Sequence, residues 1–186
     1  MKNKQKLIIF ALSIIVALTA TISIGQRFQE PTSQPYETYK SFIDTPVSKI
    51  SARDIRNTLG NPVTTEYQFE DGVTYYEYTS PDVPYRQRVW TDTNGKILAI
   101  LLQIPSSQQE DQDAVLQKYE SDNLNHFSYM REYGNVTNVA YPLEGKTYII
   151  DQKTQKVVAV RLYDAMELEA YQQIFVQQGE GDTDTY

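Results

Sequence analysis

Two stretches of the chain, about sixty residues apart, carry nearly the same pattern: residues 96–102 read KILAILL and residues 156–162 read KVVAVRL. The likeness extends upstream to four further residue pairs: Ile55 with Val115, Leu59 with Tyr119, Tyr67 with Phe127, and Phe69 with Tyr129. Self-similarity at a fixed period indicates a duplicated supersecondary unit. The sequence therefore predicts an α+β fold of two tandem repeats, each a helix followed by an antiparallel sheet.

The first unit is predicted over residues 48–105. Ser51 and Asp54 have the spacing of a capping box, so we expect a helix to begin there. Gly60 and Pro62 are typical of a helix end. Alternation of apolar and polar residues then predicts four strands, at residues 65–69, 73–79, 86–92 and 96–104, with turns at 70–72 and 93–95.

The second unit is predicted over residues 106–178. Residues 110–120 repeat the helix, and strands are expected at residues 127–133, near 139–143, at 146–151 and at 156–163. Asp164 with Glu167 predicts a further helix that closes the unit. Residues 179–186 are expected to form an acidic tail.

The N-terminus has the pattern of a membrane segment. Lys2, Lys4 and Lys6 precede an uncharged run over residues 7–25. As a helix, this run would span roughly 28 Å, enough to cross a bilayer. We expect residues 1–25 to be a signal peptide or, preferably, a hydrophobic anchor helix that leaves the rest of the chain outside the cytoplasm. Residues 26–47, rich in Gln, Pro, Ser and Thr, are then predicted to be a flexible stalk.

The net charge and the lack of cysteine exclude several classes of binding partner and of covalent or metal site. Without the three N-terminal lysines, 14 basic residues face 24 acidic ones, a net charge of −10 for the exported part. Such a field repels phosphate backbones and argues against nucleic-acid binding. The chain contains no cysteine, which excludes disulfides, cysteine-ligated metals and a lipid anchor on a cysteine thiol.

The predicted helix end Leu59-Gly60-Asn61-Pro62 and the turn over residues 92–96 (DTNGK) lie among aromatic-rich strands. In this, the chain resembles the small α+β module of outer-membrane assembly lipoproteins of the BamE type. Doubled in tandem, residues 48–163 resemble the arrangement of the beta-lactamase inhibitory protein. Unlike those families, this chain has neither an acylatable cysteine nor disulfides. The resemblance implies a non-catalytic module that binds another protein with one face of a sheet.

The sequence contains no catalytic or metal-binding signature. His126 is the single histidine, so no imidazole pair can bind a metal. A Gly-x-Ser-x-Gly nucleophile element is absent. The carboxylates cluster at a predicted helix start or in the tail, where dipole and solvation effects explain them: Glu110, Asp111 and Asp113; Glu167 and Glu169; Glu180, Asp182 and Asp184. We therefore predict no enzyme and no cofactor.

Aromatic and arginine side chains concentrate in one short region, and we predict a protein-binding surface there, formed by Tyr76, Tyr78, Tyr85, Arg86, Arg88 and Trp90. Tyr, Trp and Arg dominate interface hot spots. The alternative is that one strand face packs on the helices and the other carries residues of high β-propensity. The predicted function is binding of an unknown envelope or secreted protein by a membrane-anchored module. A secreted inhibitor of a beta-lactamase or protease, or an envelope glycan hydrolase with paired carboxylates, are the alternatives.

Overall fold

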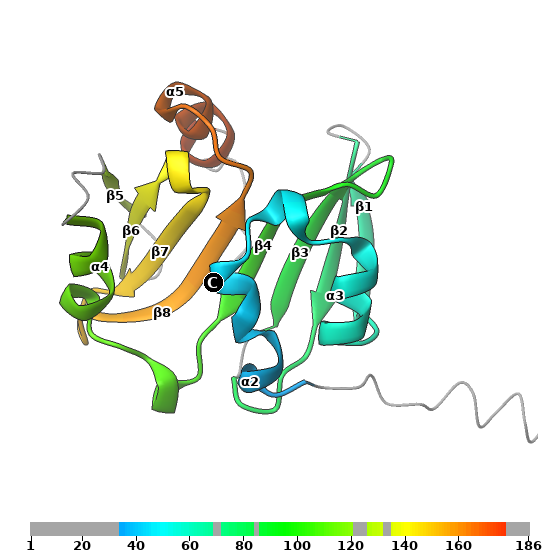
Figure 1. Ribbon diagram of the computed structural model, residues 1–186, viewed down its shortest axis with the longest axis horizontal. Helices are drawn as coiled ribbons and strands as arrows, with labels where there is room; N and C mark the ends of the chain where they lie inside the picture. The colour runs from blue at the N-terminus through cyan, green and yellow to red at the C-terminus, as the bar shows by residue number, and fades with distance from the viewer. Residues whose placement is uncertain (1–33, 69–71, 84–85, 121–125, 132–134, 178–186) are drawn as a thin grey trace, which may run out of the picture. The chain divides into compact units, whose positions relative to one another are not determined.

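The computed structural model describes residues 34–68, 72–83, 86–120, 126–131 and 135–177. These residues build an antiparallel sheet with the strand order β1-β2-β3-β4-β8-β7-β6-β5 (Figure 1). Its strands are β1 (Thr64–Gln68), β2 (Val73–Tyr78), β3 (Gln87–Asp92), β4 (Ile97–Gln103), β5 (Phe127–Arg131), β6 (Val136–Tyr141), β7 (Lys146–Asp151) and β8 (Lys156–Tyr163). The α+β class is thereby confirmed. The predicted segments 1–25 and 179–186 lie outside the described residues.

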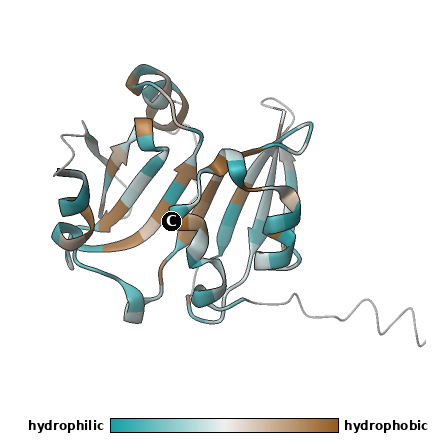
Figure 2. Cartoon of the chain, viewed as in Figure 1, coloured by the Kyte–Doolittle hydropathy of each residue, from teal (hydrophilic) through white to brown (hydrophobic). Residues whose placement is uncertain are grey.

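Each half of the sheet consists of four strands, and strands that are consecutive in the chain pair with one another. Helix α3 (Ala52–Leu59) precedes the first half, and helix α4 (Gln112–Glu120) precedes the second. The halves meet where β4 pairs with β8, with Leu101 opposite Arg161. The predicted units 48–105 and 106–178 thus share one continuous sheet. Figure 2 shows that the two joining strands are largely hydrophobic, because neither is an edge strand and both carry buried side chains on each face.

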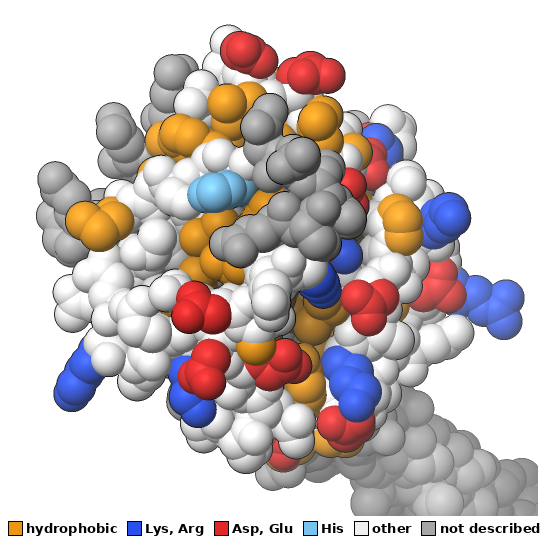
Figure 3. All heavy atoms as spheres, turned by 60° about the vertical axis from the view of Figure 1, so that its left-hand side comes forward, with side chains coloured by type: hydrophobic (Ala, Val, Ile, Leu, Met, Phe, Trp, Pro, Cys, Tyr) orange, Lys and Arg blue, Asp and Glu red, His pale blue; other side chains and the backbone are white. Residues whose placement is uncertain are grey.

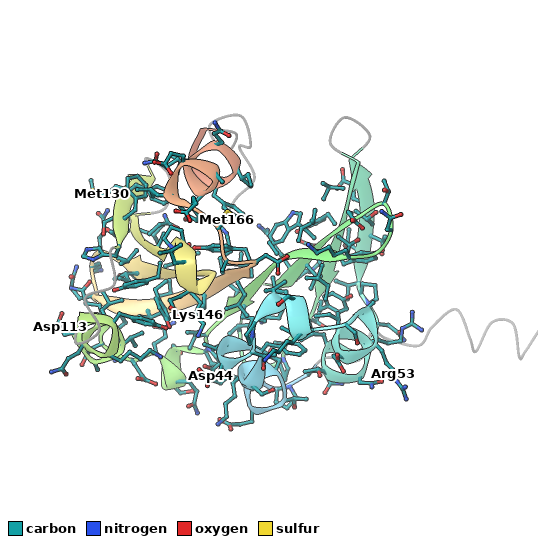
Figure 4. All side chains as sticks on the ribbon, turned by 45° about the horizontal axis from the view of Figure 1, so that its top comes forward. Asp44, Arg53, Asp113, Met130, Lys146 and Met166 are labelled. Atoms are coloured by element: carbon teal, nitrogen blue, oxygen red, sulfur yellow. The ribbon has the colours of Figure 1, made fainter. Side chains whose placement is uncertain are left out.

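Helices cover the two faces of the sheet unequally. On the face that we call the helix face, α3 and α4 pack together with the short N-terminal helices α2 (Tyr36–Tyr39), η1 (Lys40–Asp44) and η2 (Val47–Lys49). The opposite face carries α5 (Leu168–Tyr171) and the π-helix η5 (Gln172–Gln177), which pack near β5, β6 and β8 (Figure 4). Two single turns, η3 (Ser106–Gln108) and η4 (Pro142–Glu144), complete the elements. The main hydrophobic core lies on the helix face.

The expectation of a flexible stalk over residues 26–47 is wrong for the part of it that the structure describes. The three short helices α2, η1 and η2 lie within residues 36–49, and Tyr39, Phe42 and Val47 belong to the main core. Tyr39 is completely buried. The polar composition was misleading because a few regularly placed apolar side chains suffice to hold a segment onto a sheet. Residues 26–33 lie outside the described residues.

Helix α3 begins as predicted. The Ser51 side chain accepts a hydrogen bond from the Asp54 backbone N–H, and the Asp54 carboxylate accepts from the Ser51 backbone N–H at 2.9 Å. This capping box satisfies two donors that the first helical turn leaves free. The helix then buries Ile55 and Leu59 on one side.

We expect the substitution Ser51→Ala to lower the free energy of unfolding by about 1 kcal/mol, the usual contribution of an N-cap. The hydrogen bond from the Ser51 side chain is the largest cause that holds the pKa of Asp54 below its ordinary value. The same substitution should therefore raise the pKa of the Asp54 carboxyl. Urea denaturation measures the first effect and NMR titration the second; an unchanged Asp54 pKa would contradict the cap.

In both halves, an aspartate side chain accepts backbone hydrogen bonds in the turn that connects the third and fourth strands. Asp92, at the end of β3, accepts hydrogen bonds from the backbone N–H groups of Asn94 and Lys96, both at 2.8 Å. Asp151, at the end of β7, accepts from those of Lys153 and Thr154. Each strand also shows a register shift shortly before its aspartate, after Trp90 in β3 and after Ile149 in β7.

Candidate functional site

The strand register separates the residues predicted to form one binding surface. Tyr76 lies opposite Val89 and Tyr78 opposite Gln87, and all four belong to the helix face. Tyr78 is 5% exposed, and burial raises its pKa to about 12. Tyr78 is therefore a core residue. The prediction that Tyr76 and Tyr78 share one binding surface with Arg86, Arg88 and Trp90 is therefore wrong. Tyr85 lies outside the described residues.

The opposite face brings together the other predicted residues. Trp90 pairs with Tyr75 and Arg88 with Glu77 across β2 and β3. Directly opposed residues of an antiparallel pair share a face, so these four side chains are neighbours. Arg86, just before β3, reaches the same group. We call Tyr75, Glu77, Arg86, Arg88 and Trp90 the β2–β3 patch.

Glu77 is the centre of the β2–β3 patch. Arg86 Nη1 donates a hydrogen bond to Glu77 Oε2 at 2.8 Å, and Arg88 Nε lies 3.5 Å from Oε1. The Tyr75 hydroxyl also donates to Oε1. Three side chains thus hold one carboxylate whose side chain is 14% exposed. The charge-assisted hydrogen bond from Arg86 and the ion pair with Arg88 direct both arginines toward this carboxylate.

The pKa values agree with this arrangement. Burial raises the pKa of Glu77, but the hydrogen bonds from Tyr75 and Arg86 and the arginine charges lower it further, so that its net shift is downward. Burial and the bond to Glu77 raise the pKa of Tyr75. At neutral pH the carboxylate is consequently ionised and the phenol protonated, which preserves the whole set of hydrogen bonds.

Trp90 joins the β2–β3 patch to the body of the sheet. Its ring centroid lies 5.5 Å from that of Tyr75, and the Arg88 guanidinium lies 5.9 Å from the Tyr75 centroid. Behind it, Trp90 packs against the buried side chains Leu101 and Ala159. The aromatic side chains are only partly exposed, and the side chain of Arg86 is 49% exposed. The β2–β3 patch thus rests on buried side chains, and its own side chains are partly accessible to solvent.

Sequence reasoning missed Tyr75 and Glu77. The period of two along residues 73–78 does separate Tyr75 from Tyr76 and Tyr78. What it does not reveal is which of the two sets faces the same way as Arg88 and Trp90. That depends on the pairing register of β2 and β3, which the intervening loop determines.

A groove of about 420 Å³ opens on the helix face between α2, η1 and α4. Apolar and charged side chains line it together, and the charged ones are Glu37, Lys40, Asp44, Glu110 and Lys118. Tyr148 also lines the groove, and its hydroxyl lies 2.7 Å from that of Tyr119. Burial raises the pKa of Tyr148, so its phenol stays protonated at neutral pH and offers hydrogen bonding rather than a nucleophile.

Within the described ranges, no three His, Asp or Glu side chains lie close enough together to hold a metal ion. His126 is exposed, and its ring lies 5.8 Å from that of Tyr141 (Figure 3). Acidic and basic side chains are interspersed on the surface that Figure 3 presents. Of the helices that the structure describes, none has the length and apolar character to cross a membrane. The predicted segment 7–25 is outside that part of the chain.

No protein-family model matches the chain, and no curated protein matches it. Among solved structures, it is similar to an extracellular protein containing a SCP domain from Bacillus anthracis str. Ames, with 17% sequence identity and a TM-score of 0.40. The match covers 61% of this chain and 43% of that protein, so the chain spans less than half of its length. A TM-score this low does not establish a shared fold, and no activity is transferred from it.

Proposed function

We propose that the chain is a membrane-anchored, extracytoplasmic and non-catalytic module that binds another protein of the cell envelope through the β2–β3 patch. The observation that carries this proposal is the convergence of Tyr75, Arg86, Arg88 and Trp90 on one accessible sheet face. Tyr, Trp and Arg are the residue types that contribute most to interface hot spots. Glu77 holds both arginines in place before a partner arrives, which reduces the entropy lost on binding.

The proposed module is a tandem duplication of the BamE-like unit. The matching aspartate-capped turns at Asp92 and Asp151, and the register shifts that precede them, support this origin. Bulges are features of a fold rather than accidents, so their occurrence at matching positions favours a common ancestor for the two halves. The strand order, in which one half mirrors the other about the β4–β8 pair, agrees with duplication.

The proposed location rests on the three lysines and the uncharged segment 7–25. Fractionation of cells that express the tagged chain should place it in the membrane, from which it is released by detergent and not by salt. A mature form in the culture supernatant, beginning near Ile24 or Gln26, would instead favour the secreted inhibitor. Either result is read by mass spectrometry of the N-terminus.

The β2–β3 patch is tested by photo-crosslinking in intact cells. A crosslinking amino acid at Glu66, which is exposed and lies opposite Tyr75 on β1, should capture a partner. Arg86→Glu in the same chain should reduce the adduct about tenfold or more, as expected for a charge in a hot spot. Both changes leave the core untouched.

A matched control uses the other side of the molecule. Arg53 is exposed on α3 and projects away from the sheet (Figure 4), so Arg53→Glu makes the same charge change outside the patch. It should leave the Glu66 adduct unchanged. An adduct that responds equally to both variants, or one that forms only from a crosslinker at Asn57 on α3, would refute binding through the β2–β3 patch.

A further inference from the structure

Three buried apolar side chains line the groove on the helix face, and they come from the two strands that join the halves of the sheet. Ile104 directly follows β4, and Val157 and Val160 belong to β8. The groove volume of about 420 Å³ lies within the usual range of small-molecule sites, about 300–1,000 Å³. The groove can therefore take up the apolar part of a small molecule.

The charged residues that line the groove have a net charge of −1, since three of them are acidic and two are basic. Lys40 forms an ion pair with Glu37. Lys118 lies over the ring of Tyr119, 5.1 Å from its centroid. In the part of the chain that the structure describes, neither Asp44 nor Glu110 has an ion-pair partner. The charge that complements this groove is thus positive.

The carboxylates of the groove lie close enough to two tyrosines to act on them. Burial is the largest cause that raises the pKa of Tyr36, and the charges of Glu110, Glu37 and Asp44 raise it further. Burial is also the largest cause that raises the pKa of Tyr148, and Asp44 contributes to that shift. Aromatic rings and carboxylates both attract an ammonium group, so the two kinds of side chain favour the same ligand charge.

We propose that the groove binds a small organic cation with an apolar body. Its ammonium group lies beside Asp44 and Glu110, and its apolar body packs on Ile104, Val157 and Val160. A metal ion would make no use of the apolar side chains, and a neutral apolar molecule would leave both carboxylates unpaired. Binding here does not depend on the proposed function, because the β2–β3 patch lies on the opposite face of the sheet.

Two probes of nearly equal shape test the charge of the ligand: 4-phenylbutylammonium and the neutral 4-phenylbutanol. Isothermal titration calorimetry measures their binding to the full chain in detergent micelles, after subtraction of the heat of transfer into protein-free micelles. We expect the amine to bind about tenfold more tightly than the alcohol, or better. Salt raised from about 0.05 M to about 0.5 M should weaken binding of the amine alone, because it screens the exposed carboxylates.

A pair of matched variants locates the site. The double variant Asp44→Asn, Glu110→Gln removes both charges at nearly constant side-chain size. It should weaken the amine about tenfold and leave the affinity for the alcohol unchanged. The control Asp113→Asn, Glu144→Gln makes the same changes at two exposed carboxylates that do not line the groove (Figure 4), so it should alter neither affinity. Thermal unfolding followed by circular dichroism verifies that both variants are folded.

Several outcomes would overturn the proposal. These are equal affinities for the amine and the alcohol, no binding of the amine at millimolar concentration, and equal weakening by the groove variant and its control. An acetylated and amidated lysine peptide that displaces the amine at a lower concentration than the amine itself requires would assign the groove to a basic protein segment. That result would also overturn the assignment to a small molecule.

Discussion

Tyr39→Ala is expected to lower the free energy of unfolding by about 3–5 kcal/mol, the range for removing a large aromatic side chain from a core. Tyr39 is completely buried under the sheet. Its hydroxyl donates to the Gln103 carbonyl at 3.2 Å and accepts from Gln87 Nε2 at 3.0 Å. Gln87 is itself fully buried and accepts from the Gln103 backbone N–H. The substitution thus leaves a cavity and breaks a buried polar network.

Urea denaturation followed by circular dichroism measures this effect, with two further variants. Tyr39→Phe keeps the ring and leaves buried polar groups without the hydroxyl, so a loss of about 1–3 kcal/mol is expected. Glu37→Ala, on the exposed side of the same helix, should stay within about 0.5 kcal/mol of the parent. If Tyr39→Ala unfolds like the parent, residues 36–44 are a stalk after all.

Tyr39 should also make the free energy of unfolding depend on pH in the alkaline range. Burial is the largest cause that raises the pKa of Tyr39, to about 12, whereas an unfolded tyrosine titrates near 10. The folded state therefore retains a proton that the unfolded state loses. Its contribution to stability is complete below pH of about 10 and is lost as the pH rises through about 12. Tyr39→Phe should reduce the alkaline loss of stability relative to the parent.

Gly145→Ala is expected to destabilise the protein by roughly 3 kcal/mol or more, for two reasons that act together. Gly145 has φ +65°, a conformation that alanine adopts at a cost. An added Cβ would also lie 2.2 Å from the Tyr163 carbonyl oxygen. That oxygen belongs to the end of β8, where the Tyr163 side chain is 2% exposed and held by the Thr147 hydroxyl. The strand cannot yield without disturbing this cluster.

Gly95→Ala is the matched control. Gly95 has φ +78°, but an added Cβ would meet nothing within 4 Å. It should cost only the left-handed backbone conformation, about 1–2 kcal/mol. Thermal and urea unfolding measure the loss of stability in both variants. The difference between the two losses gives the cost of the close contact with the Tyr163 carbonyl oxygen. Equal losses at the two positions would show that β8 moves freely near Tyr163, against the packing described above.

The sequence by itself determined the local features. Alternating residues located the strands, although β6 begins at Val136 rather than near residue 139. Ser51 and Asp54 located the start of α3, and Gly60 its end. The contacts behind these predictions lie within a few residues of one another, so short patterns encode them. The expected function class also came from the sequence, through the N-terminal segment and the aromatic content.

Only the tertiary structure decided the long-range features. It paired β4 with β8, placed Tyr39 in the core, and turned Tyr76 and Tyr78 toward the helices while Tyr75 and Glu77 joined Arg88 and Trp90. A register shift of one residue moves every side chain of a strand to the other face, and no local pattern specifies that shift. The β2–β3 patch exists because β2 and β3 pair in one particular register, which only the folded chain reveals.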